Sequence, residues 1–207
     1  MKYIYTSQVE GDVIEFGVMT GNSSIAFSVS LKFLNDRYKD FKKKILFFDS
    51  FKGLPKIENQ IDLTSDHVKK KIWYEGGCQG YKETEFKKII KKNLDENYFT
   101  IYNGWFADQV KLIPKDSKFA LIHIDSDLYQ SCIDSLGYLF ENNMISEGTI
   151  ILFDDYNSNQ SSKETGERKA WYELVDKYNI DFTDLGVYAH ASNRFIVHNY
   201  LMNKYAS

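Results

Sequence analysis

Carboxylates close several apolar stretches of this sequence, at positions where a buried strand would end. Asp125 follows the stretch FALIHI, and the pair Asp154 and Asp155 follows TIILF. Carboxylates that face one another across neighbouring strand ends repel strongly unless a cation or a shared proton relieves them. Because oxygen ligands favour a hard ion, we expect these acids to bind Mg²⁺ ahead of Ca²⁺ or Mn²⁺. For any one of them alone, an aspartate at a helix N-cap is the simpler interpretation.

Two residues beside these acids have open roles. Asp127 comes two residues after Asp125, where it could be a further metal ligand, a general base or a helix cap. Asp125 could also serve as the base, so the catalytic base is predicted at one of these two positions. His123 precedes Asp125 by two residues and shares its face of the strand. We expect His123 to be a hydrogen-bonded core group, with a supporting role behind the metal site as the alternative.

A second candidate site lies in residues 11–30, where a strand runs into a glycine-interrupted turn and then into a helix. Gly17 and Gly21 bracket the turn, and glycine is needed where a ligand approaches the backbone closely. The helix N-terminus offers unpaired N–H groups to the polar end of a nucleotide-like ligand. Glu15, just before the turn, could accept a hydrogen bond from an ammonium or a hydroxyl group. The residues expected to cap the helix are Asn22, Ser23 and Ser24, and a connection without any ligand is the alternative.

Two further strand ends carry residues that suit a nucleotide. Asp49 ends the stretch ILFFD. An acid at the end of the second strand of a doubly wound sheet commonly accepts the ribose hydroxyls. Gly104, Trp105 and Phe106 follow the third predicted strand, where an adenine could stack on the two rings. Packing of the same rings in the core is the alternative.

The elements that would position these residues alternate along the chain as strand and helix. The predicted strands are 13–17, 45–49, 98–104, 119–125, 149–153, about 181–188 and 194–199, and the predicted helices are 22–38, 83–94, 131–142 and 166–179. Ligands of an open parallel sheet bind beyond the carboxyl ends of its strands, so acids at successive strand ends meet in space. Residues 56–82, which we call the insert, show no clean period and are expected to form a lid or binding loop. We predict one α/β domain over residues 1–207.

Composition argues against several classes of protein. The 207 residues are 43% hydrophobic and carry a formal net charge of −3, which argues against a partner bound through a phosphate backbone. No apolar run approaches the roughly 20 residues of a membrane helix, and the N-terminus lacks a signal-peptide core. Cys78 and Cys132 are too far apart in sequence for a metal-binding pair. We therefore expect a cytoplasmic protein with reduced thiols and without nucleic-acid or membrane partners. The serine-hydrolase elbow, the Walker loop and the GxGxxG fingerprint do not occur.

The blocks VIEFGVMTGNSS, FFDSFKGLP, YNGWFADQV, HIDSDLYQS, IILFDDYN and GERKAWYE occur in this order over most of the chain. Together they resemble the macrocin-type O-methyltransferases, which use S-adenosylmethionine to methylate sugar hydroxyls on macrolide antibiotics. The resemblance implies a Rossmann-like class I methyltransferase fold, with a doubly wound, mostly parallel seven-stranded sheet whose final strand pair is antiparallel.

The same resemblance implies roles for individual residues. Those implied to bind S-adenosylmethionine are Glu15, Gly17, Gly21, Asn22, Ser23, Ser24, Asp49, Ser50, Gly104, Trp105, Phe106 and Asp125, and those implied to bind Mg²⁺ are Asp125, Asp154 and Asp155. The reaction would be an in-line displacement in which the cation lowers the pKa of the attacking hydroxyl and aims it at the sulfonium methyl. The acceptor would be a small hydroxylated molecule, either a glycoside or a sugar-nucleotide.

Relatives of this type carry a helical segment before the first strand that helps to cover the active site and often mediates dimer contacts. About ten residues precede the first strand here. The dimer contacts of such relatives make a homodimer one expectation, whereas the short segment of this chain leaves the acceptor pocket, the oligomeric state and activity as open questions. Two alternatives to the enzyme stay open: a cofactor-binding module that has lost catalysis, and a Mg²⁺-dependent enzyme on a Rossmann-like fold that modifies a nucleotide-sugar.

Overall fold

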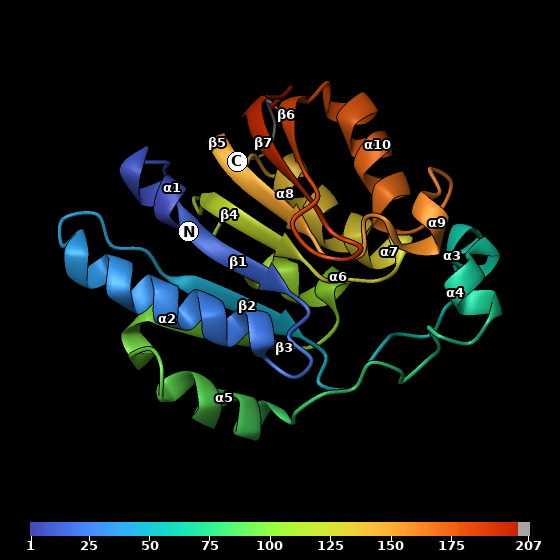
Figure 1. Cartoon of the computed structure of the whole chain (residues 1–207), viewed down its shortest axis with the longest axis horizontal. Coiled ribbons are helices and arrows are strands. Elements are labelled where there is room, and N and C mark those ends of the chain that lie inside the picture. The colour runs from blue at the N-terminus through green and yellow to red at the C-terminus, as the bar shows by residue number, and fades with distance from the viewer. Residues whose placement is uncertain (203–207) are drawn as a thin grey trace.

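The computed structural model describes residues 1–202, in which seven strands form one mixed sheet (Figure 1). The strands are β1 (Asp12–Phe16), β2 (Ile45–Asp49), β3 (Phe99–Asn103), β4 (Phe119–Ile124), β5 (Ile145–Phe153), β6 (Asp181–Gly186) and β7 (Asn193–Asn199). Their order across the sheet is β3-β2-β1-β4-β5-β7-β6. Strands β1 to β5 pair in parallel, whereas β7 pairs antiparallel with both β5 and β6. The predicted Rossmann-like sheet with an antiparallel final pair is confirmed.

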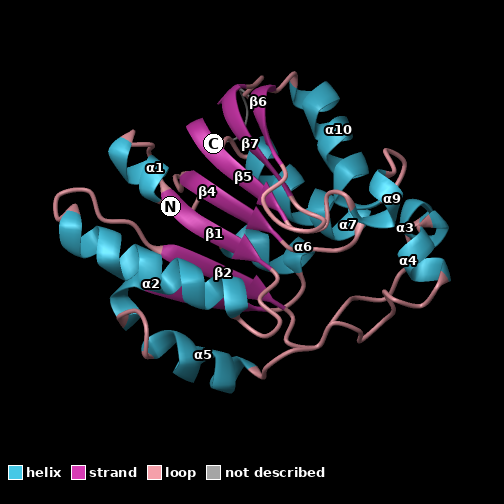
Figure 2. Cartoon of the chain, viewed as in Figure 1, coloured by secondary structure: helices cyan, strands magenta, loops and turns pink. Residues whose placement is uncertain are grey.

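Helices fill the connections between the strands (Figure 2). They are α1 (Lys2–Thr6), α2 (Asn22–Arg37), α3 (Gln60–Thr64), α4 (Asp66–Lys69), α5 (Glu83–Lys91), α6 (Phe106–Gln109), α7 (Tyr129–Cys132), α8 (Tyr138–Glu141), α9 (Ser158–Ser161) and α10 (Gly166–Tyr178), with short 3₁₀ turns η1 (Glu96–Tyr98) and η2 (Val110–Leu112) and a π turn η3 (Ile133–Gly137). The helix predicted at 131–142 is therefore a run of α7, η3 and α8. Within residues 1–202, no helix combines the length and the apolar character that crossing a membrane requires.

Side chains of the strands alternate between two cores, one on each face of the sheet, as the two-residue period of a strand requires. Val13 and Phe47 belong to the core that also contains the buried residues of α1, α2 and α5. Ile14 and Phe48 belong to the core on the other face, together with residues of α7, α8 and α10 such as Trp171. Figure 1 shows α2 crossing one face of the sheet near β1 and β2.

Two parts of the fold differ from the prediction. Strand β5 begins at Ile145 and not at 149, because the chain continues through an irregular stretch in which Gly148 has a φ of +83°. The Thr149 hydroxyl holds this stretch by donating to the carbonyl of Phe119 at 2.7 Å. The insert is also more regular than expected, since it contains α3 and α4. Both helices are too short for a hydrophobic period to be visible in the sequence.

Candidate active site

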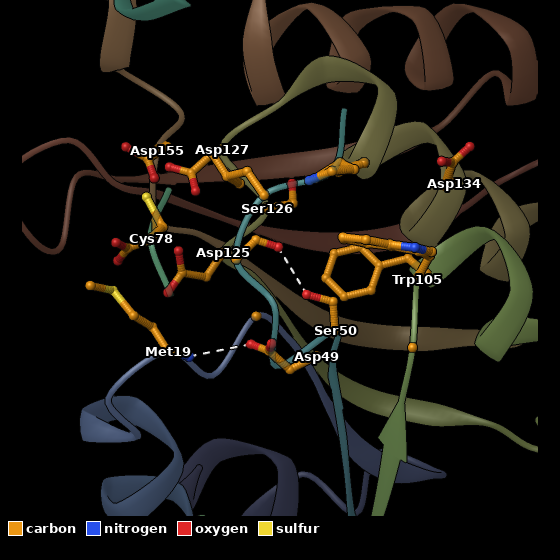
Figure 3. Close-up of a pocket in the computed structure, with 18 residues that line it drawn as sticks. Met19, Asp49, Ser50, Cys78, Trp105, Asp125, Ser126, Asp127, Asp134 and Asp155 are labelled. Carbon is orange, nitrogen blue, oxygen red and sulfur yellow. Dashed lines mark hydrogen bonds between the residues drawn. The ribbon is translucent and has the colours of Figure 1, made fainter. Parts of the chain in front are cut away.

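Acids at the ends of β4 and β5 come together at the carboxyl edge of the sheet. The two strands are parallel neighbours, and the backbone N–H of Asp154 donates to the carbonyl of Ile124 at 2.9 Å, which carries the ladder to the end of both strands. Carboxylate oxygens of Asp125, Asp154 and Asp155 lie within 4.8 Å of one another. We call these three residues the acid cluster. Figure 3 shows Asp127 on the same side of the cavity, next to Asp155.

The surroundings of the acid cluster disfavour several bare negative charges. Burial raises the pKa of Asp125 to about 8, and the charges of Asp154 and Asp155 add to the rise. Burial also raises the pKa of Asp154, again with a contribution from Asp155. The pKa of Asp127 is raised well above its ordinary value by burial and by the neighbouring carboxylates. Carboxylate oxygens at this spacing, in a partly buried position, fit a hard divalent cation such as Mg²⁺.

The acid cluster lines a cavity of about 290 Å³ at the carboxyl ends of the strands (Figure 3). The predicted site residues that line this cavity are Gly17, Asp49, Ser50, Gly104, Trp105, Phe106, Asp125, Asp127, Asp154 and Asp155. Further lining residues are Met19, Gly53, Leu54, Pro55, Cys78, Ser126, Ser131 and Asp134. One cavity thus joins residues predicted to bind a nucleotide-like cofactor with those predicted to bind a cation.

The turn after β1 is held by Asp49 at the end of β2. The Asp49 carboxylate accepts hydrogen bonds from the backbone N–H groups of Val18 at 2.8 Å, Met19 at 3.3 Å and Phe51 at 2.6 Å. Figure 3 shows the bond from Met19. Gly17 has a φ of +88°, and a Cβ at this position would lie 2.0 Å from the carbonyl oxygen of Asp125. The turn therefore requires glycine at this point. A carboxylate has about four lone-pair sites, so Asp49 can hold the turn and still accept a ribose hydroxyl.

Two rings after β3 form another wall of the cavity. Trp105 is 39% exposed and lies on the side away from Asp155 in Figure 3. Phe106 packs edge-on against Phe16, with 5.3 Å between the ring centroids. The sequence left two roles open for these rings, stacking on an adenine and packing in the core, and the structure distinguishes the two rings. Phe106 belongs to the core as well as to the lining, whereas the Trp105 ring remains accessible to a ligand.

Part of the predicted cofactor site lies outside the cavity lining, namely Glu15, Gly21, Asn22, Ser23 and Ser24. Glu15 is fully buried between the sheet and α2, where it accepts a hydrogen bond from the Ser24 hydroxyl at 2.6 Å. Its other oxygen lies 3.0 Å from Nδ1 of His123, so His123 is the hydrogen-bonded core group that the sequence predicts. The prediction that Asn22, Ser23 and Ser24 cap α2 with their side chains is wrong. The N-cap is Gly21 with a φ of +72° and no side chain caps the helix, since the Ser24 hydroxyl is committed to Glu15.

The insert is attached to the loops that follow β4 and β5. Asp62 accepts hydrogen bonds from the backbone N–H groups of Tyr129 at 2.7 Å and Gln130 at 3.1 Å, at the N-terminus of α7. The backbone N–H of His67 donates to the side-chain oxygen of Asn159 at 2.8 Å. Figure 1 shows α3 and α4 next to α9. The insert therefore closes the side of the molecule that borders the acid cluster.

Two residues next to the acids carry no distinctive signal in the sequence. Cys78 of the insert lines the cavity, and burial together with the charge of Asp127 raises the pKa of its thiol to about 12. Glu167 is fully buried in the first turn of α10 and accepts a hydrogen bond from the backbone N–H of Asp155 at 3.0 Å. An acid in the first turn of a helix is a common feature, so its position in the block GERKAWYE could not reveal this contact.

Sequence comparison identifies related proteins. A family model described as Macrocin-O-methyltransferase (TylF) matches residues 1–184. The chain is 27% identical over 149 residues to the 8-demethyl-8-(2,3-dimethoxy-alpha-L-rhamnosyl)-tetracenomycin-C 4'-O-methyltransferase of Streptomyces olivaceus. This alignment covers 72% of the chain and 54% of the relative, so the chain spans about half the length of that curated relative.

Solved structures with the same fold include two methyltransferases. The O-methyltransferase NovP superposes with a TM-score of 0.76 at 21% identity, covering 96% of this chain and 76% of NovP. The calicheamicin methyltransferase CalS11 superposes with a TM-score of 0.70 at 20% identity, covering 94% of this chain and 75% of CalS11. At these identities the likeness establishes the fold. The family model that matches residues 1–184 shows that the chain belongs to the macrocin-O-methyltransferase (TylF) family.

Proposed function

We propose that this chain is an S-adenosylmethionine-dependent O-methyltransferase that uses a divalent cation and acts on a hydroxyl group of a sugar. One observation carries the proposal: a single cavity brings the turn after β1, the end of β2 and the rings after β3 together with the acid cluster. Methyl transfer needs a cofactor methyl and an acceptor oxygen held close and in line. A cavity lined by both sets of residues can hold the two reactants in that way.

The cofactor half of the cavity is assigned to the residues after β1, β2 and β3. Gly17 would let the backbone of the turn pass close to the cofactor, and Asp49 and Ser50, which line the cavity at the end of β2, would accept the ribose hydroxyls. The accessible ring of Trp105 supplies a surface on which the adenine stacks. Met19 also lines the cavity and adds apolar contact.

The acceptor half of the cavity is assigned to the acids. The acid cluster would hold Mg²⁺, which supplies positive charge that stabilises the deprotonated form of the acceptor hydroxyl. Asp127 lies beside the cluster, and we assign it as the group that takes the hydroxyl proton, with Asp125 as the alternative. The insert and Trp105 exclude water, which strengthens the electrostatic interactions within the cavity.

A sugar is the acceptor class that the relatives favour. The curated relative is named for transfer to the rhamnosyl group of a tetracenomycin, and CalS11 is described as a TDP-rhamnose 3'-O-methyltransferase. Two neighbouring hydroxyls of a sugar ring also suit a cation that keeps two positions open. The name of the curated relative puts a methoxy group on the carbon next to the methylated 4'-hydroxyl, so the second oxygen need not be a free hydroxyl. The acceptor is therefore proposed to be a glycoside or a sugar-nucleotide with a free hydroxyl next to a second oxygen substituent of the ring.

The first test is calorimetric titration of the protein with S-adenosylhomocysteine, with and without Mg²⁺. We expect micromolar binding, on the order of −8 kcal/mol. Absence of binding under both conditions would refute the cofactor assignment. Preference for a nucleotide-sugar over S-adenosylhomocysteine would favour a different Rossmann-like enzyme.

The variant Asp154→Ala tests the cation assignment, with Asp134→Ala as a matched control. Asp134 lines the same cavity but lies away from the acid cluster in Figure 3. We expect Asp154→Ala to lose most of its affinity for Mg²⁺ while its affinity for S-adenosylhomocysteine changes less than about threefold, and Asp134→Ala to keep both. Equal Mg²⁺ affinity of the two variants would contradict the assignment of the acid cluster as the cation site.

A further inference from the structure

Glu167 connects the two strand ends that carry the acid cluster. Its side chain is fully buried in the first turn of α10. One carboxylate oxygen accepts from the backbone N–H of Ser126 at 3.0 Å and from the Ser126 hydroxyl at 3.2 Å. The other oxygen accepts from the backbone N–H of Asp155 at 3.0 Å. Ser126 directly follows Asp125, so the carboxylate contacts the backbone next to one cluster residue and the backbone of another.

These hydrogen bonds begin where the ladder of the sheet ends. Strands β4 and β5 are joined up to the bond from the N–H of Asp154 to the carbonyl of Ile124, and beyond it their chains enter separate loops. The carboxylates at this point repel one another, which favours separation of the two loops. Glu167 opposes that separation because each of its oxygens holds one of the loops.

The contacts suit a carboxylate and not a neutral amide. Two backbone N–H groups donate to different oxygens of Glu167, and a backbone N–H can only donate. A glutamine would present its NH₂ group to one of these N–H donors, so the hydrogen bond that holds one of the two loops would be lost. Burial and the nearby charges of Asp155, Asp125 and Asp127 raise the pKa of Glu167. The N–H donor of Ser126 and the first turn of the helix oppose that rise because they favour the negative charge.

We infer that Glu167 is a positioning residue that fixes the distance between the carboxylates of Asp125 and Asp155 and thereby sets the affinity of the acid cluster for a divalent cation. The inference rests on the cation site of the proposed function and assigns Glu167 no contact with substrate or cofactor. Residues that orient ligands in this indirect way typically change metal affinity by about tenfold to a hundredfold when replaced.

The test measures binding of Mn²⁺ alone by calorimetry, to the full chain and to the variants Glu167→Gln and Glu167→Asp. We expect both variants to bind Mn²⁺ at least about tenfold more weakly than the unmodified chain. Their affinity for S-adenosylhomocysteine should stay within about threefold, because Glu167 does not line the cofactor half of the cavity. Aspartate keeps the charge but is one methylene shorter, so it should fail to hold both loops.

The matched control is Asp62→Asn. Asp62 is a buried carboxylate that also accepts from two backbone N–H groups, but both belong to the start of α7. This variant should lose stability and keep its Mn²⁺ affinity. Comparing this variant with Glu167→Gln therefore distinguishes the effect of losing buried hydrogen bonds from the effect of changing the distances within the acid cluster.

Three outcomes would overturn the inference. The first is unchanged Mn²⁺ affinity in folded Glu167 variants, and the second is an equal loss of affinity in Asp62→Asn. The third is failure of both Glu167 variants to show a cooperative thermal transition even with saturating S-adenosylhomocysteine, since the residue would then serve folding and not the site. A further outcome would separate the two ideas. If the unmodified chain binds Mn²⁺, both Glu167 variants bind it at least about tenfold more weakly, and the unmodified chain binds no S-adenosylhomocysteine, then the proposed function fails and the inference stands.

Discussion

Replacing His123 by phenylalanine should destabilise the protein far more than removing an exposed ion pair. The Glu15 carboxylate is fully buried and has two side-chain partners, His123 Nδ1 at 3.0 Å and the Ser24 hydroxyl at 2.6 Å. His123→Phe leaves this carboxylate with one donor in an apolar layer, where the edge of Phe27 already packs on the imidazole ring. Burial alone lowers the pKa of His123, but the hydrogen bond and the charge of Glu15 raise it above its ordinary value, and the two groups form a charged pair while the imidazole is protonated. Breaking one side of such a buried pair costs about 3–5 kcal/mol. We therefore expect the free energy of unfolding to fall by about that amount.

The double variant Glu15→Met with His123→Phe makes this prediction specific. Removing both polar groups leaves no buried carboxylate, so the double variant should lose less stability than the sum of the single variants, with an interaction energy of about 1–3 kcal/mol. The assay is urea denaturation followed by circular dichroism at pH 7. Asp66→Asn is the reference, because the Asp66 to Lys70 pair is exposed and should cost less than about 1 kcal/mol. Strict additivity of the two single variants would refute the reasoning.

Two further predictions concern the turn after β1 and a buried lysine. Gly17→Ala should lower stability by about 2–4 kcal/mol and weaken S-adenosylhomocysteine binding, because the new Cβ would collide with the carbonyl of Asp125. The control is Gly76→Ala, since Gly76 has a similar φ of +78° and no atom within 4 Å of an added Cβ. Urea denaturation and calorimetric titration would compare the two variants, and equal losses of stability would contradict the collision at Gly17. Burial lowers the pKa of Lys43 from 10.5 to about 8, so the unfolded chain binds more protons between these values and stability should rise with pH across that range. Urea denaturation at about pH 7.5 and about pH 9.5 should show this rise reduced in Lys43→Met, and an equal rise in both proteins would count against it.

The strand ends were predictable because they depend on local patterns. Strands β2 and β4 are short and almost entirely apolar, and Asp49 and Asp125 close these runs. Once the strands are known to be parallel, their carboxyl ends must lie on one edge, which is why the acid cluster could be expected. The antiparallel final pair, in contrast, was expected from the resemblance to a family and not from periodicity.

The contacts behind the site could not be predicted because they depend on register. Glu15 faces His123 only because β1 and β4 pair with these two residues opposite each other, and a shift of one residue would place them on different faces of the sheet. The contacts of Glu167 could not be predicted either, because its partners Ser126 and Asp155 lie in two separate loops that come together only in the folded sheet. The side-chain cap of α2 was mispredicted because the helix begins at Asn22 with Gly21 as its N-cap, and because the Ser24 hydroxyl donates to the buried Glu15 carboxylate.

The attachment of the insert through Asp62 has a consequence for hydrogen exchange. The backbone N–H groups of Tyr129 and Gln130 donate to Asp62, so they are protected from solvent deuterium by a residue of the insert and not by their own helix. Whenever the insert detaches, these two amides lose their acceptor together. Their exchange rates therefore report the open population of the insert, at a place in the chain more than sixty residues away from Asp62.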